Sequence, residues 1–419
     1  MDSLPKRTHE NTRRRVRLAY LVTHPIQYQA PLLRRIAQEP DIDLTVFFGS
    51  DFSVRGYKDV GFGSVGVKWD VALLGGYRHE FLPVVRDNAT VTPTTPINRG
   101  IFRRLKGTAA KPPFDALWVH GYASVNTLHG ILAASALGIP VLVRAESWLG
   151  DRERSGRKLA VKKLYLRALS HLVDGILPIG TLNAEYWRHY MGEDFPLFLM
   201  PYAVDNEYFR QRSMVAAGRR QELQAELNLD STRPVILFAS KLRERKRCAD
   251  LLEAYRRLSP SPGVDPHPYL IIVGDGEQRA ALERAAQDTG FSSSIRFCGF
   301  RNQSELPRFF DLSTVFVLPS RHEPWGLIIN EVMNAERPVI VSDEVGCQRD
   351  LITPGVEGEV FPAGNVDALT AVLRKTLATP ETAQEMGRRA LDRIRSWSFE
   401  EDIRGLRQAL AHVTRKITP

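Results

Sequence analysis

The sequence predicts an α/β protein made of two domains, each built around its own parallel sheet. The chain has 419 residues, which is too long for one ordinary hydrophobic core and suits two domains of about 200 residues. Short apolar segments rich in β-branched residues also alternate with helical patterns along the whole chain, as in parallel βαβ units. Both observations indicate a pair of doubly wound sheets.

The apolar segments fall into two groups, each large enough for a sheet. In the first half the expected strands span residues 17–23, 44–49, 116–120, 140–144 and 174–179. In the second half they span residues 234–239, 269–274, 295–299, 314–318, 338–342 and 359–362. Residues 51–113 are rich in glycine and proline, so we expect a large irregular insertion near the cleft.

A joint is expected between residue 201 and about Asp230, where a charged helical stretch at 219–229 follows the segment 201–209. We divide the chain into a flexible basic N-terminus (1–16), a first domain (17–208), a second domain (209–397) and a last segment (398–419). That segment has an amphipathic pattern over residues 398–413 with Ser398 as its N-cap, which predicts a helix. It could pack on either domain.

Composition limits the functional classes. The net charge of +9 favours an anionic partner such as phosphate, nucleic acid or an acidic membrane surface. The three cysteines, Cys248, Cys298 and Cys347, lack metal-ligand spacing and suit a reducing compartment. No apolar stretch follows the N-terminal arginines and none reaches eighteen residues, so we expect neither a secretion signal nor a membrane span, and a cytoplasmic protein.

The stretch PSRHEPWGLIINE, at residues 319–331, follows an expected strand and opens a helix that runs to about Ala335. A loop-to-helix junction at the carboxyl end of a parallel strand directs free backbone N–H groups toward an anion, which predicts a diphosphate site. Glu323 and Glu331 flank this junction. Carboxylates repel phosphate but accept hydrogen bonds from vicinal hydroxyls, so one suits a sugar and the other a ribose. The alternative is that Glu323 is a turn residue and Glu331 a solvated helix residue.

The stretch SKLRERKRCADLL, at residues 240–252, directly follows another expected strand. Lys241 and Lys246 lie five residues apart among three arginines, so they can neutralise a nucleoside diphosphate without a metal. A solvated basic surface is the alternative.

Two glycine patterns are weaker signals. Gly274 and Gly276, in IIVGDGE at residues 271–277, form a reduced dinucleotide turn that strand–turn–helix packing explains equally well. Gly61, Gly63 and Gly66 match GxGxxG, but no clear strand precedes them and no helix follows, so we interpret them as a loop.

The first half offers candidates for the other side of a cleft. His24 and His120 end expected strands, and both face the cleft if the sheet edges point there. Arg144 and Glu146 follow another strand and form either a buried ion pair or an acceptor contact.

A basic helix is expected at residues 157–172. It either packs on its own domain or lies on an anionic bilayer. Basic residues lie on one face of this helix, namely Arg157, Lys158, Lys162, Lys163 and Arg167. The opposite face is apolar and consists of Leu159, Val161, Leu164, Ala168 and Leu172.

The motifs of the second half, taken jointly, resemble those of the family-4 retaining glycosyltransferases. The resemblance covers roughly residues 197–395 and rests on PYAVDNEYF, SKLRERKR, IIVGDGE, EPWGLIINE and RPVIVSDEVGC in that order. It implies the GT-B fold, in which two Rossmann-like domains face each other across a cleft and the C-terminal helix returns to the first domain. In the N-terminal half, THPIQYQAP departs from the family's Gly-Gly loop near the acceptor. In the second half, Trp325 replaces a frequent Phe.

The resemblance also implies roles for individual residues. Lys241, where the family usually has Arg, and Lys246 would bind the donor phosphates, and Glu331 would accept the ribose hydroxyls. Glu323 and His120 would lie at the transferred sugar, so with Lys246 they are the catalytic candidates. The backbone around Trp325, Gly326 and Leu327, together with Gly274, would complete the donor site.

The implied activity is metal-independent transfer of a hexose, with retention of anomeric configuration, from a UDP- or GDP-sugar that serves as donor substrate. No cofactor is held permanently. The acceptor is a cell-envelope glycan, polysaccharide, lipid-linked or small molecule, with peripheral contact with an anionic membrane and no nucleic acid. The leaving phosphate oxygen helps to deprotonate the acceptor on the same face.

Other classes remain as alternatives. A nucleotide-sugar epimerase or a phosphorylase fits the same fold, because fold does not fix function. An NAD-dependent oxidoreductase needs a full glycine fingerprint, which is missing at the first strand. A nucleic-acid binder is suggested by charge alone, without motif signatures.

Overall fold

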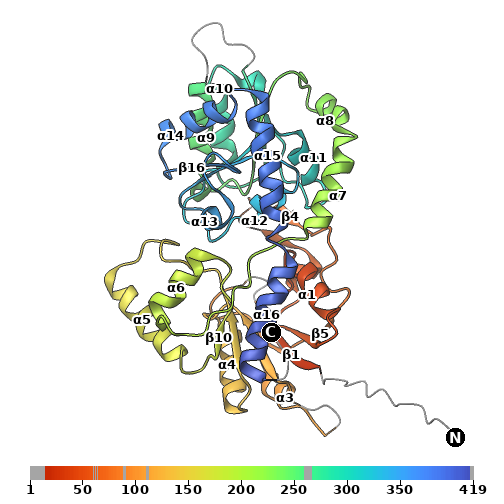
Figure 1. The fold of residues 1–419 in the computed structure, drawn as a ribbon, viewed down its shortest axis with the longest axis vertical. Coiled ribbons are helices and arrows are strands. Elements are labelled where there is room, and N and C mark those ends of the chain that lie inside the picture. Colours follow the sequence, from red (N-terminus) through yellow and green to blue (C-terminus); the bar gives the residue numbers. More distant parts are fainter. Residues whose placement is uncertain are drawn as a thin grey trace, which may run out of the picture.

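The structure is a computed structural model that describes residues 15–59, 61, 63, 65–87, 91–109, 113–258 and 267–415. Residues 1–14 of the expected basic N-terminus lie outside the described residues. The chain forms two lobes, and the C-terminal helix runs back along the lobe that contains the first half of the chain (Figure 1).

The first lobe contains a six-stranded parallel sheet with the order β10-β9-β8-β1-β2-β5. Its strands are β1 (Val16–Val22), β2 (Ile42–Phe48), β5 (Arg78–Phe81), β8 (Ala116–His120), β9 (Val141–Arg144) and β10 (Gly175–Ile176). Its helices are α1 (Ala30–Ala37), α2 (Phe52–Arg55), α3 (Ile101–Lys106), α4 (Val125–Ala136), α5 (Gly156–Leu169) and α6 (Thr181–Met191).

The second lobe repeats this architecture, with the sheet order β13-β12-β11-β14-β15-β16. Its strands are β11 (Val235–Ala239), β12 (Tyr269–Val273), β13 (Ile295–Phe297), β14 (Val315–Leu318), β15 (Val339–Ser342) and β16 (Gly358–Phe361). Its helices are α7 (Asn206–Ala217), α8 (Arg220–Glu226), α9 (Cys248–Leu258), α10 (Arg279–Gln287), α11 (Leu306–Leu312), α12 (Leu327–Met333), α13 (Gln348–Leu351), α14 (Val366–Thr376) and α15 (Pro380–Arg395).

Burial explains why these segments form parallel sheets. Strands β9, β11, β12, β14 and β15 are buried along their whole length, as expected when helices cover both faces of a sheet. Each sheet accordingly has one hydrophobic cluster on either side. Both orders follow the doubly wound Rossmann pattern, so the predicted fold class is confirmed.

Every expected strand overlaps an observed one, but β5 was not predicted. Its sequence, Arg-His-Glu-Phe, is polar because β5 lies at the edge of the sheet, where one side faces water. The expectation that residues 51–113 are irregular was therefore wrong in part. This stretch contains β5, α2, α3 and the short antiparallel pairs β3 (Tyr57–Asp59) with β4 (Val65–Val67) and β6 (Val84–Arg86) with β7 (Ile97–Asn98).

The last helix, α16 (Phe399–Thr414), belongs to the core of the first lobe. Ser398 caps it in a reciprocal capping box with Glu401, as its sequence predicts. Ile403 and Leu406 pack in the first lobe's cluster, and the Asp402 carboxylate accepts a hydrogen bond of 2.9 Å from Arg144 on β9. The chain thus returns to the first lobe.

The domain division at residue 208 falls inside α7, which contacts α11 and α12 of the second lobe. We therefore propose a division at Asp205, the N-cap of α7. Within the described ranges, no helix is long and apolar enough to span a bilayer.

Candidate active site

The candidate site lies where the strand order reverses in both sheets. In doubly wound proteins, ligands bind outside the carboxyl ends of the strands at this switch point. A cavity of roughly 390 Å³ occupies this place between the lobes. Its walls come from the loops after β1, β11, β12, β13 and β14, together with the start of α12 and the segment around β3 and β4.

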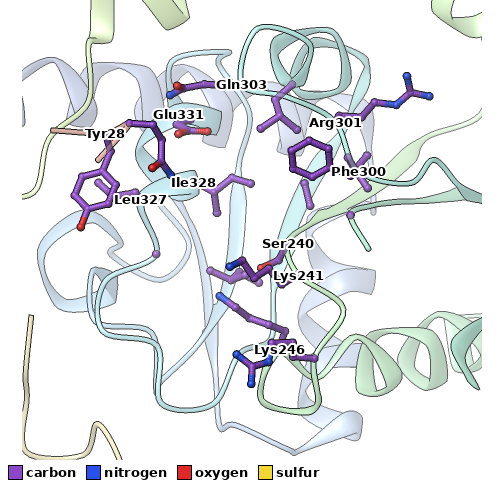
Figure 2. A pocket seen from close by; sticks show the side chains of 18 of the residues that line it. Tyr28, Ser240, Lys241, Lys246, Phe300, Arg301, Gln303, Leu327, Ile328 and Glu331 are labelled. Carbon is purple, nitrogen blue, oxygen red and sulfur yellow. The ribbon is translucent and has the colours of Figure 1, made fainter. Parts of the chain in front are cut away.

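One end of the cavity is cationic. Lys241 and Lys246 line it, with Arg243 and Arg245 beside them, and Figure 2 shows both lysines on the same side of the pocket. Lys246 is buried, and its ammonium donates a hydrogen bond to the carboxylate of Glu323. Burial lowers the pKa of Lys246, and the charge of Glu323 opposes that shift. The solvated-surface alternative therefore does not describe Lys246.

The turn after β12, which contains Gly274 and Gly276, packs against the loop that contains these lysines. A Cβ on Gly274, where φ is +131°, would lie 1.9 Å from the carbonyl oxygen of Ser240. A Cβ on Gly276 would lie 2.5 Å from that of Leu242. The turn thus packs against the lysine loop, and Gly274 also lines the cavity. Its glycines are explained by close backbone approach.

The start of α12 faces the same cavity through Gly326, Leu327 and Ile328. The first N–H groups of a helix lack partners within the helix and can donate to an anion. Gly326 has a φ of +91°, in the left-handed region that glycine accepts readily. The side chain of Trp325 instead points into the core, where it stacks on Trp397 at 5.6 Å. Only the backbone of Trp325 stays a candidate for the donor site.

The other end of the cavity holds Glu331, Gln303, Phe300 and Arg301. Figure 2 shows Glu331 and Gln303 together, away from Lys246. Burial raises the pKa of Glu331 to about 8, although a hydrogen bond from Gln303 acts against this shift. Glu331 is thus a cavity residue, not a solvated helix residue.

The first lobe contributes a hydrogen-bonded cluster beside the cavity. Glu146 accepts hydrogen bonds from the hydroxyls of Tyr28, at 2.8 Å, and of Tyr202. The Nε2 atom of His120 lies 3.7 Å from the same carboxylate. Burial pushes the pKa of Glu146 upward, but His120 and the two hydroxyls outweigh it and the pKa falls to about 2. Tyr28 also lines the cavity and so connects this cluster with it.

Two first-lobe expectations change in the structure. Arg144 does not pair with Glu146; its guanidinium binds Asp402 and the carbonyl oxygens of Met200 and Pro201. His120 ends β8 as expected but is not among the residues that line the cavity. Burial and then the charge of His120 lower the pKa of His24 to about 4, so His24 is neutral near pH 7.

Several cavity residues were not singled out from the sequence, namely Tyr28, Trp69, Phe300 and Gln303. Tyr28 lies inside THPIQYQAP, the stretch whose departure from the family pattern was the one available signal. Trp69 lies in residues 51–113, where an irregular insertion was expected, and irregular segments give no periodic signal.

Comparison with known proteins places the second lobe in a family. Residues 219–393 match the family described as Glycosyl transferases group 1. The second lobe is a group 1 glycosyltransferase domain. This glycosyltransferase domain contains Lys241, Lys246, Glu323 and Glu331, so the cationic end of the cavity and its carboxylates lie within the matched region.

Relatives share this likeness over different parts of the chain. An alpha-D-kanosaminyltransferase of Streptomyces kanamyceticus is 30% identical over 41% of this chain and 44% of its own length. A GDP-mannose-dependent alpha-(1-6)-phosphatidylinositol monomannoside mannosyltransferase of Mycolicibacterium smegmatis is 26% identical over 75% of this chain and 79% of its own. The chain thus spans less than half of the first of these relatives.

Solved structures show the fold of both lobes. A glycosyltransferase of Rickettsia africae superposes with a TM-score of 0.70 at 13% identity, over 95% of this chain and 98% of that one. Anabaena HepE in complex with UDP superposes with a TM-score of 0.68 at 13% identity, over 94% and 100%. The glycosyltransferase domain and the first lobe together therefore have the GT-B fold.

Proposed function

We propose that the protein is a retaining glycosyltransferase that uses a nucleoside diphosphate sugar without a metal ion. The observation that carries this proposal is the polarity of one interdomain cavity. Lys241 and Lys246 lie at one end, where they can neutralise a diphosphate, and Glu331 lies at the other, where it can bind ribose hydroxyls. The family match covers the same residues.

The chemistry follows from this placement. The bond between the anomeric carbon and the β-phosphate oxygen breaks, and the acceptor oxygen forms a new bond to that carbon from the same face. The acceptor proton passes to the departing phosphate oxygen. Lys246 stabilises the charge that develops on this oxygen, an interaction that strengthens in the transition state. Glu323 accepts a hydrogen bond from Lys246, and we propose that it also accepts hydrogen bonds from the sugar hydroxyls.

The first lobe is proposed to hold the acceptor. His120 and Glu146 lie beside the cavity on this side, and Tyr28 connects them with it. Similar proteins support both uridine and guanosine donors: HepE was solved with UDP, and the mannosyltransferase is GDP-mannose-dependent. We therefore propose a UDP- or GDP-sugar, with a glycan, lipid-linked or small-molecule acceptor.

A panel of UDP- and GDP-sugars tests this function by the products formed. We expect one donor to yield free nucleoside diphosphate in step with glycosylated acceptor, and an α-linked donor to give an α-linked product in NMR spectra. An isomeric nucleotide-sugar without acceptor glycosylation would identify an epimerase. Sugar 1-phosphate formed from orthophosphate would identify a phosphorylase.

We further propose that the protein binds its acceptor at an anionic membrane surface and that α5 binds this surface. If the apolar face of α5 packed on its own domain, Leu159, Val161 and Leu164 would be buried, but all three are exposed, the last two by 69% and 73%. Leu166 and Leu169 are buried in their place. An exposed helix face that combines apolar and basic side chains is typical of interfacial helices. Lys162 differs from the other cations, because its ammonium lies 4.4 Å from the ring centre of Tyr186.

Co-sedimentation with vesicles tests the membrane contact. We expect the protein to bind vesicles with anionic lipid and not vesicles of phosphatidylcholine alone. The double variant Val161→Glu and Leu164→Glu should lose this binding, whereas Met214→Glu, at an exposed position of α7 in the second lobe, should keep it. Equal binding by both variants would contradict the assignment to α5.

A further inference from the structure

Residues 68–70 of the first lobe, which we call the strap, reach across to the second lobe. They follow β4, which lies at the level of α12 where the lobes meet (Figure 1). The side-chain amide of Asn302 donates a hydrogen bond of 2.8 Å to the carbonyl oxygen of Lys68. The backbone N–H of Ser304 donates one of 3.1 Å to the carboxylate of Asp70. The strap is therefore fastened on both sides of Trp69.

Trp69 and Phe300 face each other at this crossing. Both side chains are half-buried and line the cavity. Their ring centres lie 6.5 Å apart, with an angle of 65° between the ring planes. The two rings come from different lobes, so this part of the wall exists only where the strap docks.

The position of the rings matches the part of the donor that the other residues leave unassigned. The proposed function places the diphosphate at Lys241 and Lys246 and the ribose at Glu331. In a nucleoside diphosphate the base leaves the ribose on the side away from the phosphates. The base must therefore extend past Glu331 toward the loop that contains Gln303 and Phe300, and Figure 2 shows these residues at that end.

We propose that Trp69 and Phe300 form the nucleobase subsite, so that the donor site is completed by the first lobe. This proposal rests on the proposed function. Because the rings are inclined at 65°, a planar base can stack on the face of one ring and meet the other ring edge to face. Stacking on an aromatic side chain tolerates different bases. The strap makes Trp69 a residue that sets affinity for the nucleotide, although it lies outside the glycosyltransferase domain. It also couples donor binding to the position of the two lobes.

Titrations of UDP, GDP and inorganic pyrophosphate separate base stacking from phosphate binding. We expect Trp69→Ala to weaken UDP and GDP by about tenfold to a hundredfold, and to leave pyrophosphate unchanged within about twofold, because pyrophosphate has no base. Trp69→Phe should restore most of the affinity. Phe102→Ala, an exposed aromatic residue on α3 outside the cavity wall, should bind all three ligands like the wild type.

The outcomes distinguish the subsite from the wider function. If Trp69→Ala weakens nucleotides and pyrophosphate equally, or neither, the subsite is overturned and the phosphate site stands. If the wild-type protein binds none of the three ligands, the proposed function falls and the subsite with it. Asp70→Asn, which leaves Trp69 in place and weakens the fastening to Ser304, should lose part of the nucleotide affinity and none of the pyrophosphate affinity. Melting temperatures of all variants control for folding.

Discussion

The two lobes share a sheet order but carry different chemistry at the same structural position. In the second lobe the loops after β11 and β14 present Lys241, Lys246 and Glu323 to the cavity. In the first lobe the loop after β1 presents Tyr28 to the cavity, whereas His120, at the end of β8, lies behind it against Glu146, with neutral His24 nearby. One side suits a diphosphate, and the other suits hydroxyl groups and proton positioning. The fold fixes where a ligand binds, and the loops decide which ligand it is.

The lobes also differ in their cores, because the first lobe includes α16 from the C-terminal end of the chain. The largest expected effect tests the contribution of this helix. Asp402 comes from α16 and is fully buried against Arg144. Asp402→Ala should cost about 3–5 kcal/mol of unfolding free energy, because it leaves a buried guanidinium without its partner. Urea unfolding measures this loss. The control is Glu400→Ala on the same helix, which removes an exposed ion pair with Arg35 of α1 and should cost less than about 1 kcal/mol. Equal losses would contradict the role of α16.

Substitution of the buried Lys246 tests the proposed phosphate site of the second lobe. Lys246→Ala is expected to lower kcat by about 10²–10³ and kcat/KM with it, because the ammonium stabilises charge that develops in the transition state. Steady-state kinetics measure both parameters. The control is Arg256→Ala, a cation of the same lobe whose guanidinium pairs with Glu253 at the surface. Similar, mild effects in both variants would move the phosphate site elsewhere.

The raised pKa of Glu331 gives the nucleotide site a pH dependence. Bound as a carboxylate, Glu331 must release a proton below its pKa of about 8, so donor affinity should rise with pH up to about 8 and then level off. Glu331→Gln should remove this dependence and weaken binding by about 1–3 kcal/mol above pH 8. Calorimetric titrations in buffers of different ionisation enthalpy measure the proton release. A pH-independent wild-type affinity would contradict the ribose assignment.

The same pKa shift acts on stability with the opposite sign. The folded protein binds a proton at Glu331 that the unfolded chain, with a pKa near 4.5, releases. This contribution is complete below pH 4.5 and is lost as pH rises to about 8. Glu331→Gln should therefore lose less stability than the wild type between these values.

The smallest expected effect is on the first lobe. Tyr28→Phe removes one hydroxyl that binds Glu146, and this costs about 0.5–1.5 kcal/mol for a single hydrogen bond. Turnover should fall less than about tenfold, while nucleotide affinity stays within about twofold, because the proposed phosphate, ribose and base contacts are made by other residues. A large loss of nucleotide affinity would contradict the assignment of Tyr28 to the acceptor side.

The sequence predicts well the buried strands and the residues of the second lobe that line the cavity. The central strands were found because both faces of each are covered and their residues are apolar. Lys241, Lys246, Gly326 and Glu331 were found because they follow strands in order. Contacts between distant segments gave no local signal: Asp402 lies 258 residues from Arg144, and Trp325 turns inward because Trp397 stacks on it. Edge strand β5 and Trp69 were missed because a polar edge and a loop carry no periodicity.

Titration of UDP and GDP into the wild-type protein in EDTA tests the central claim most directly. The claim is that Lys241 and Lys246 replace a divalent ion at the diphosphate. It predicts that one of the nucleotides binds in EDTA, that added Mg²⁺ changes its Kd by less than about twofold, and that Lys246→Ala weakens it. Binding that requires Mg²⁺ or Mn²⁺, or that is unchanged in Lys246→Ala, would contradict the claim.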